Sequence, residues 1–218
     1  MILKNERLVS EVWGQFCKDP RLALIAIRHA NKADSTPRGG LSSRGEDQVF
    51  RMMLATQVVI QDLTMKRLFK FLAANTRRNI TTLVRLVPFF RDPERCISTP
   101  PSLDIPYLGP HDKDVETCAR LATKLGITSN EAFALDWKKY GVKRLGETPE
   151  ANHARIREGL KTALDREPNG VIVYCGNSPP MNAALGIPGV MAELEALFFS
   201  HKDGQFQLLD HVAPKFLD

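Results

Sequence analysis

Two side chains able to act on an anion stand together where an apolar run of the sequence ends. The run covers residues 22–27, and Arg28 and His29 follow it directly. The pair is either the ordinary polar end of a buried strand or a site for chemistry on an anion. An arginine fork binds phosphate oxygens in pairs, and a neutral imidazole is a competent nucleophile toward phosphorus. Phosphoryl chemistry requires further cations near this strand end.

Polar residues gather in three further segments that a fold could bring to the same place. They read GGLSSRGEDQ at 39–48, AANTRRNITTL at 73–83 and VIVYCGNSPPMNAAL at 171–185. The second segment holds Arg77 and Arg78, which are equally good local candidates for a second cation. The third ends an apolar run with Cys175, Gly176 and Asn177. Cys175 is either a reactive thiol beside the pocket or a buried packing residue, and the absence of an identifiable base favours packing.

Hydrophobic periodicity and turn residues predict alternating strands and helices that position these groups. Apolar runs predict strands at 22–28, 68–73, 170–175 and 205–210. Helices are expected at 5–17, at 79–90 and at 148–165, and Thr148 and Pro149 mark the start of the last. A further helix of about 18 residues is expected to begin at Ser43, because Ser43 and Glu46 have the spacing of a capping box. The proline-rich stretch 91–111 predicts a long loop, and helical stretches are expected at 112–125 and 129–140.

The alternation predicts one α/β domain over residues 1–218. Its expected form is a three-layer α/β/α sandwich around a mostly parallel central sheet, with a loop and helical insertion at about 91–150. The strands at 22–28, 68–73 and 170–175 should lie centrally, because each is short, apolar and followed by a loop or a helix start. Ligand sites of such sheets form at the carboxyl ends of the strands, and Arg28 and His29 lie at such an end.

The composition limits the functional classes. With 218 residues, 43% of them hydrophobic, the chain can build a full core, and its apolar runs are far too short to span a bilayer. No apolar signal region opens the sequence, so we expect a cytoplasmic protein without a membrane partner. The net charge of +5 suits an anionic substrate, whereas the interleaving of acids and bases argues against nucleic acid. The four cysteines are scattered, and neither a metal nor a cofactor is expected.

The quoted segments, taken in chain order, resemble the histidine phosphatase superfamily, which includes phosphoglycerate mutases and SixA-type phosphohistidine phosphatases. IAIRHANKAD at 25–34 is similar to the family's strand followed by Arg-His-Gly or Arg-His-Ala. Leu41, Gly45 and Gln48 fall at matching positions of its Leu-Thr-x-x-Gly-x-x-Gln-Ala helix start, with Ser42 in place of threonine. Arg78 and Thr82 keep the Arg/Thr spacing of its Ser-Pro-x-x-Arg-x-x-x-Thr-Ala segment, although the Ser-Pro itself is missing.

The resemblance implies a phosphomonoesterase that works through a phosphohistidine. It implies His29 as the phosphorylated residue, with Arg28 and Arg78 holding the phosphate. It also implies a general acid in the loop after the Arg78 helix or in the insertion, where Asp104 lies nearest the family position and Asp92 and Glu94 are alternatives. The implied partner is a phosphorylated small molecule or a phosphoprotein. Mutase chemistry is not expected, because it requires a more complete pocket than this one.

The last strand departs from the family pattern. The family ends this strand with a second histidine that contacts the transferred phosphoryl group, and here Gly176 occupies that position. A one-residue shift offers Cys175 or Asn177 instead, and Asn177 is the first candidate for a substitute phosphate contact. Gly176 could hold a positive φ, which a histidine would strain. Three interpretations follow: a weak or specialised phosphatase, a degenerate protein that binds a phosphorylated ligand without turnover, and an unrelated α/β binding domain.

Overall fold

A mixed six-stranded sheet lies at the centre of the computed structural model, which describes residues 2–33, 40–66, 69–74, 76–88, 97–103 and 149–217. The strand order is β4-β3-β5-β2-β6-β7. The strands are β2 (Leu22–Arg28), β3 (Phe69–Ala73), β4 (Ile97–Ser98), β5 (Val171–Gly176), β6 (Ala196–Lys202) and β7 (Gln205–Val212). The first four strands of the order pair in parallel, and β6 and β7 pair antiparallel. The predicted α/β fold with three central strands is confirmed.

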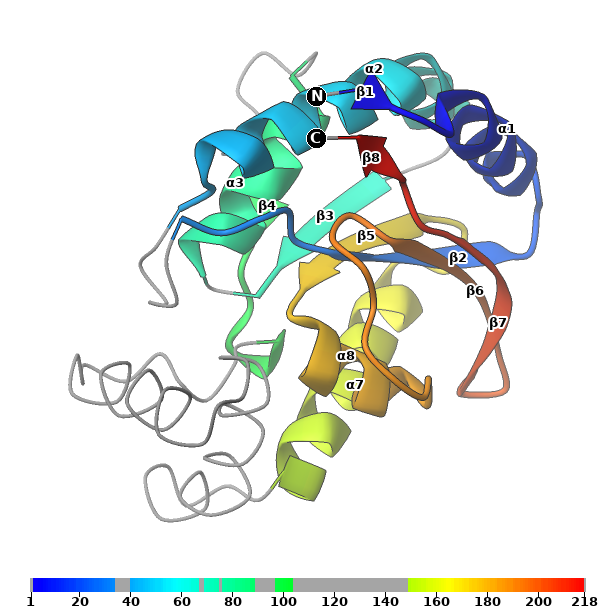
Figure 1. Cartoon of the computed structure of the whole chain (residues 1–218). Coiled ribbons are helices and arrows are strands. Elements are labelled where there is room, and N and C mark those ends of the chain that lie inside the picture. Colours follow the sequence, from blue (N-terminus) through cyan, green and yellow to red (C-terminus); the bar gives the residue numbers. More distant parts are fainter. Residues whose placement is uncertain are drawn as a thin grey trace, which may run out of the picture.

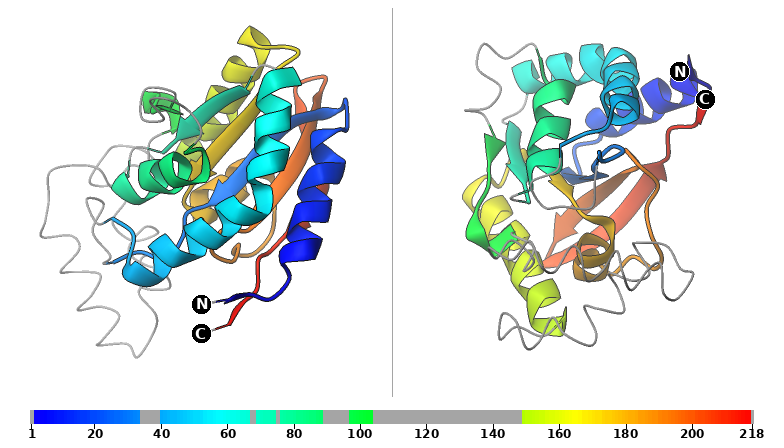
Figure 2. Two further views of the ribbon diagram at one scale, coloured as in Figure 1. Left: turned by 90° about the horizontal axis from the view of Figure 1, so that it is seen from above. Right: turned by 60° about the vertical axis from the view of Figure 1, so that its left-hand side comes forward.

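Helices cover both faces of the sheet (Figure 1; Figure 2, left). On one face lie α1 (Glu6–Cys17), α2 (Ser43–Lys66) and α3 (Arg77–Leu86), whose apolar side chains pack with Ile25 and Ile27 of β2. On the other face lie α7 (Pro149–Arg166) and α8 (Ser178–Leu185), which pack with Leu24 and Ala26. Alternate side chains of β2 thus pack into two apolar cores on opposite faces of the sheet, as expected for a strand buried on both sides.

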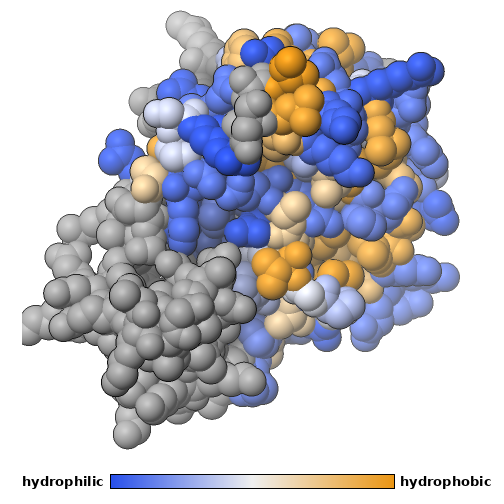
Figure 3. All heavy atoms as spheres, in the orientation of Figure 1, coloured by the Kyte–Doolittle hydropathy of each residue, from blue (hydrophilic) through white to orange (hydrophobic). Residues whose placement is uncertain are grey.

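A separate two-stranded sheet joins the two ends of the described chain. β1 (Ile2–Leu3) pairs antiparallel with β8 (Phe216–Leu217), and the two termini lie side by side in both views (Figures 1 and 2). Hydrophobic side chains gather near the top of the space-filling view, over α2 and this small sheet (Figure 3). The described surface at the left of the same view, where the parallel strands end, is mainly hydrophilic. Polar groups therefore concentrate at the edge where a ligand site is expected.

Several helices begin or end at other residues than the sequence predicted. α2 has 24 residues, more than the predicted 18, and its cap is Ser42, whose Oγ accepts the Gly45 N–H at 2.9 Å. The helix predicted at 79–90 is α3, which begins after the extended residue Thr76 and ends before Pro88, since a residue preceding proline disfavours helix. The helical stretches at 112–125 and 129–140, with most of the predicted insertion, lie outside the described residues.

The sequence analysis predicted β7, as the strand at 205–210, but missed its partner β6, the helix α8 and the two-residue strands β1, β4 and β8. The hairpin of β6 and β7 turns at Asp203 and Gly204, both with positive φ, and Asp-Gly is a favoured hairpin turn. α8 begins after Asn177 with a proline in its first turn and ends at Gly186, which has a φ of 73°. Both signals were present in the sequence. No helix among the described residues is long and apolar enough to cross a membrane.

Candidate active site

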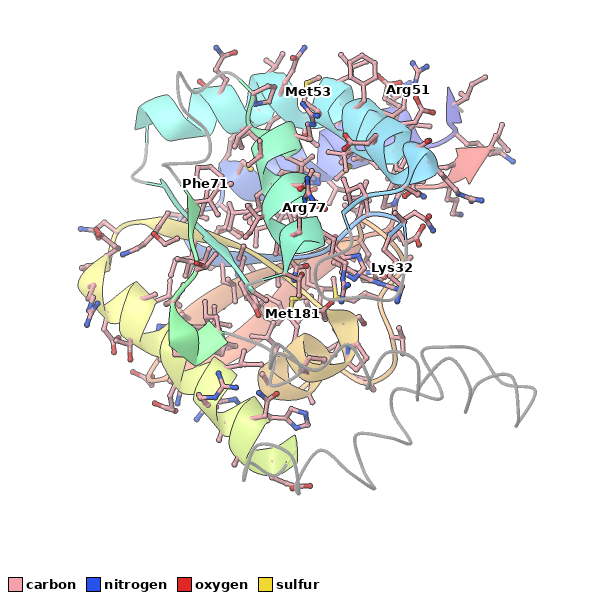
Figure 4. The ribbon with its side chains drawn as sticks, turned by 90° about the vertical axis from the view of Figure 1, so that its left-hand side faces the viewer. Lys32, Arg51, Met53, Phe71, Arg77 and Met181 are labelled. Atoms are coloured by element: carbon pink, nitrogen blue, oxygen red, sulfur yellow. The ribbon has the colours of Figure 1, made fainter. Side chains whose placement is uncertain are left out.

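The predicted site residues that the structure describes, Arg28, His29, Arg78, Gly176 and Asn177, lie at the carboxyl edge of β2 and β5. These strands are parallel neighbours whose last residues, Arg28 and Gly176, stand in register, and the His29 N–H donates to the Gly176 carbonyl at 3.4 Å. α3 begins beside this edge, directly after β3. Figure 4 faces this edge and labels Arg77 on α3 and Lys32 on the segment after β2. The strand order therefore brings three segments that are far apart in the sequence to one place, as predicted.

His29 is buried, with 6% of its surface exposed, and its ring is fixed by one hydrogen bond. Nδ1 lies 2.7 Å from the carbonyl oxygen of Ala30. A carbonyl can only accept, so Nδ1 carries the proton and Nε2 keeps its lone pair. Burial and the charge of Arg78 lower the pKa of His29 to about 3, although the Ala30 hydrogen bond acts in the opposite direction. The imidazole is therefore neutral near pH 7 and has the tautomer that a nucleophilic Nε2 requires.

The two site arginines are anchored differently. Arg28 donates from Nη1 to the carbonyl of Met191, on the loop between α8 and β6. Burial lowers the pKa of Arg28, while Glu193 and Glu195 act to raise it. Arg78 is 7% exposed, and both its Nε and its Nη2 donate to Oδ1 of Asn177, at 3.3 and 3.0 Å. Each guanidinium carries five N–H donors, so one side chain can hold the protein and an anion together.

The structure distinguishes Arg78 from its neighbour. Arg77 is exposed, and its Nε lies 3.9 Å from where a Cβ of Gly40 would stand, whereas Arg78 is buried and bonded to Asn177. Thr82 explains the Arg/Thr spacing of the motif. Its Oγ1 donates to the Arg78 carbonyl at 2.8 Å and accepts the Ala30 N–H at 3.3 Å. One turn of α3 thereby links the arginine to the backbone beside His29.

Asn177 places an unused donor at the site. Its side chain is 8% exposed, and its Nδ2 has no hydrogen-bond partner among the described residues. Thr76 Oγ1 and Asn79 Nδ2, at the start of α3, are buried and likewise without a partner in the described part of the chain. Buried polar atoms are ordinarily satisfied, so such a group marks a place where a ligand or water supplies the missing bonds.

A side chain at position 176, which the resemblance assigns to the family's second histidine, would meet the buried ring of Tyr174. A Cβ on Gly176 would stand 2.9 Å from Oη and 3.0 Å from ring carbons of Tyr174, which is buried in the core beside α7 and α8. Gly176 does not have the positive φ considered from the sequence; among the described glycines, Gly186, Gly189 and Gly204 do. The preceding residue, Cys175, is fully buried and donates from Sγ to Asn79 at 3.7 Å. Burial raises the pKa of this thiol, which favours the packing interpretation.

The Leu-x-x-x-Gly-x-x-Gln motif holds the backbone just after His29. Gln48 Oε1 accepts the Asn31 N–H at 2.9 Å, and Ser42 Oγ donates to Asn31 Oδ1 at 2.6 Å. A Cβ on Gly45 would overlap the Asn31 carbonyl oxygen, so only glycine allows this approach. The sequence analysis identified Gly45 and Gln48 by resemblance but missed Asn31 and its acceptor Glu193, because no local pattern relates residue 31 to residue 193.

Some predicted residues cannot be placed. The proposed acid Asp104 and its alternatives Asp92 and Glu94 lie outside the described residues. Across the described ranges, no group of three or more His, Cys, Asp or Glu residues could hold a metal ion.

Comparison with known proteins was made by sequence and by structure. No family model matches the sequence, and no curated protein matches it. The mycobacterial glucosyl-3-phosphoglycerate phosphatase Rv2419c, solved with VO3, is 17% identical with a TM-score of 0.53, over 86% of this chain and 97% of that one. A phosphoglycerate mutase from Bacillus anthracis is 13% identical with a TM-score of 0.58, over 87% and 92%. Phosphoserine phosphatase from Entamoeba histolytica, bound to 3-phosphoglyceric acid, is 13% identical with a TM-score of 0.56, over 87% and 96%. The chain has the phosphoglycerate mutase-like α/β fold that its motifs predicted.

Proposed function

We propose that the protein is a phosphomonoesterase in which His29 is the nucleophile. The observation that carries the proposal is a buried, neutral imidazole with its Nδ1 proton held by Ala30, beside Arg78. The same positive field that lowers the pKa of His29 attracts a phosphate dianion. The solved neighbours named above are phosphatases and a mutase, which supports this reaction class.

In the proposed reaction, Nε2 of His29 attacks phosphorus and the bond from phosphorus to the leaving oxygen breaks. The leaving oxygen takes a proton from an acid, for which Asp104 stays the candidate by resemblance. Water then attacks phosphorus and gives a proton back to the acid, and the phosphorus–nitrogen bond breaks, which releases inorganic phosphate and regenerates the neutral imidazole. The guanidinium groups of Arg28 and Arg78 would bind the phosphoryl oxygens, because charge on these oxygens must be stabilised throughout the transfer.

Asn177 is the proposed substitute for the missing histidine. Its Oδ1 is already committed to Arg78, and its Nδ2, which has no partner among the described residues, is the atom available to a phosphoryl oxygen. A neutral amide is a weaker donor than a charged group, which agrees with a weak or specialised activity. The proposed substrate is a phosphorylated small molecule or a phosphoprotein in the cytoplasm.

A second candidate function is binding of a phosphorylated ligand without turnover. It is favoured by Tyr174, which fills the space where a side chain at position 176 would stand. Turnover of an aryl phosphate by wild type and by His29→Ala separates the two functions. Activity that disappears in the variant supports the phosphatase, whereas phosphate binding with no turnover in either protein supports the binding function.

A further inference from the structure

A carboxylate on the loop between α8 and β6 connects the two segments that follow β2. Glu193 accepts a hydrogen bond on each oxygen: Oε1 from Asn31 Nδ2 at 2.8 Å and Oε2 from Gln48 Nε2 at 2.9 Å. Gln48 is 2% exposed and lies near the start of α2. The network thus joins elements that are 145 and 162 residues from Glu193 in the sequence.

The Glu193 carboxylate determines the orientation of the Gln48 side-chain amide. Because Glu193 can only accept, the Gln48 NH2 group faces it, and the amide oxygen faces the other way. That oxygen accepts the Asn31 N–H at 2.9 Å. This N–H belongs to the peptide unit between Ala30 and Asn31. The carbonyl of the same unit accepts a hydrogen bond from Nδ1–H of His29 at 2.7 Å. One rigid peptide unit therefore lies between Gln48 and the imidazole.

We infer that Glu193 is a positioning residue for His29, acting through Gln48 and the Ala30–Asn31 peptide. It fixes the carbonyl that selects the Nδ1–H tautomer and the direction of Nε2. The inference rests on the proposed function for its effect on rate, while its effect on the ring tautomer is independent of any turnover.

An exchange of the two residues tests the inference. In Glu193→Gln, one oxygen cannot accept from both Asn31 and Gln48, so the network loses a bond. In Gln48→Glu, two carboxylates face each other. The double variant Gln48→Glu/Glu193→Gln restores every bond: the carboxylate now at position 48 accepts from the Asn31 N–H and from the amide now at position 193, and the oxygen of that amide accepts from Asn31 Nδ2. The matched control is Glu11→Gln, which removes the exposed pair of Glu11 with Arg7.

For turnover of an aryl phosphate, each single variant should lose kcat by at least about 10-fold with KM changed by less than roughly threefold, since misplacement of a reacting group affects mainly the chemical step. The double variant should recover most of the loss. Nitrogen NMR of the His29 ring, read without substrate, should show the Nδ1–H tautomer in wild type, control and double variant, and a mixture in the single variants.

The outcomes separate the inference from the proposed function. Wild type without turnover counts against the phosphatase, while the NMR pattern still decides the role of Glu193. An unchanged tautomer in both single variants overturns the inference, as does a double variant that fails to recover it. If a single variant does not fold, the double variant must fold with the wild-type tautomer, and its failure to do so also overturns the inference.

Discussion

The guanidinium of Arg78 donates twice to one oxygen, Oδ1 of Asn177, from Nη2 at 3.0 Å and from Nε at 3.3 Å. The two residues are 99 positions apart in the sequence and both are buried. The amide orients the guanidinium but neutralises none of its charge, so this contact leaves the attraction of Arg78 for an anion intact. The pairing therefore supports the use of Arg78 as a phosphate ligand.

Replacing that amide by a carboxylate should therefore inactivate the site without unfolding it. In Asn177→Asp, the carboxylate pairs with Arg78 and repels phosphate. We expect phosphate binding, measured by calorimetry, to weaken by roughly 10-fold or more, because like charges about 4 Å apart interact by several kcal/mol at an intermediate dielectric constant. Asn169→Asp makes the same charge change at an exposed position and should bind phosphate as wild type does. Equal losses in both variants would contradict the specific role of Asn177.

The depressed pKa of His29 predicts how stability depends on pH. The native pKa is about 3 and the ordinary value is 6.5, so between these values the unfolded chain binds a proton that the native state excludes. The free energy of unfolding should then decrease as pH falls from 6.5, by up to about 1.4 kcal/mol per pH unit from this residue. Urea unfolding between pH 7 and pH 4 measures it. His29→Gln should show a smaller slope, and an equal slope would contradict the burial of a neutral imidazole.

Two glycines in helices should respond to alanine in opposite directions. Gly45→Ala places a methyl group on the Asn31 carbonyl, and we expect a loss of roughly 2–3 kcal/mol in the free energy of unfolding, typical of overpacking. Gly14 in α1 meets only Val59, at 3.9 Å, so Gly14→Ala should stabilise by about 0.5–1 kcal/mol through helix propensity. Denaturant unfolding checks both. Equal effects would show that helix propensity, rather than the Asn31 contact, dominates at Gly45.

Restoring a histidine at position 176 should not by itself raise the rate. Its Cβ would stand against the buried ring of Tyr174, so Gly176→His is expected to cost roughly 1–3 kcal/mol in stability. A gain in kcat is expected only when Tyr174→Leu is added, with Tyr174→Leu alone as the control. Thermal unfolding and aryl phosphate turnover are measured together. Increased activity of a stable Gly176→His single variant would contradict this, since it would show that the Tyr174 ring can move aside without loss of stability.

The fold was predictable because the parallel strands are marked locally. The run at residues 22–28 is apolar on both faces and ends at Arg28, and the observed strand has these bounds. The missed strand β6 leads into an Asp-Gly turn that could have been recognised in the sequence. The site was predictable only in part. Arg28, His29 and Arg78 lie on sequence motifs, whereas the contact of Glu193 with Asn31 depends on the path of a loop that no local pattern describes.

Position 176 is a second example in which local sequence patterns do not predict a tertiary contact. The resemblance predicts that Gly176 replaces a donor, but the direction of a side chain at that position depends on the packing of Tyr174. Likewise, Arg77 and Arg78 are equivalent in the sequence, and only the rotation of α3 about its axis makes one exposed and the other buried. Such choices are tertiary, since they follow from which face of an element meets the core.

The central claim is that His29 attacks phosphorus, and trapping of the covalent intermediate tests it most directly. The protein is mixed with an aryl phosphate, quenched in denaturant at alkaline pH within the first turnover, and digested for mass spectrometry. We expect a phosphoryl group on the peptide that contains His29, absent in His29→Ala, together with a burst of the aryl alcohol in wild type. Robust turnover that persists in His29→Ala, or a phosphoryl group on another residue, would contradict the account.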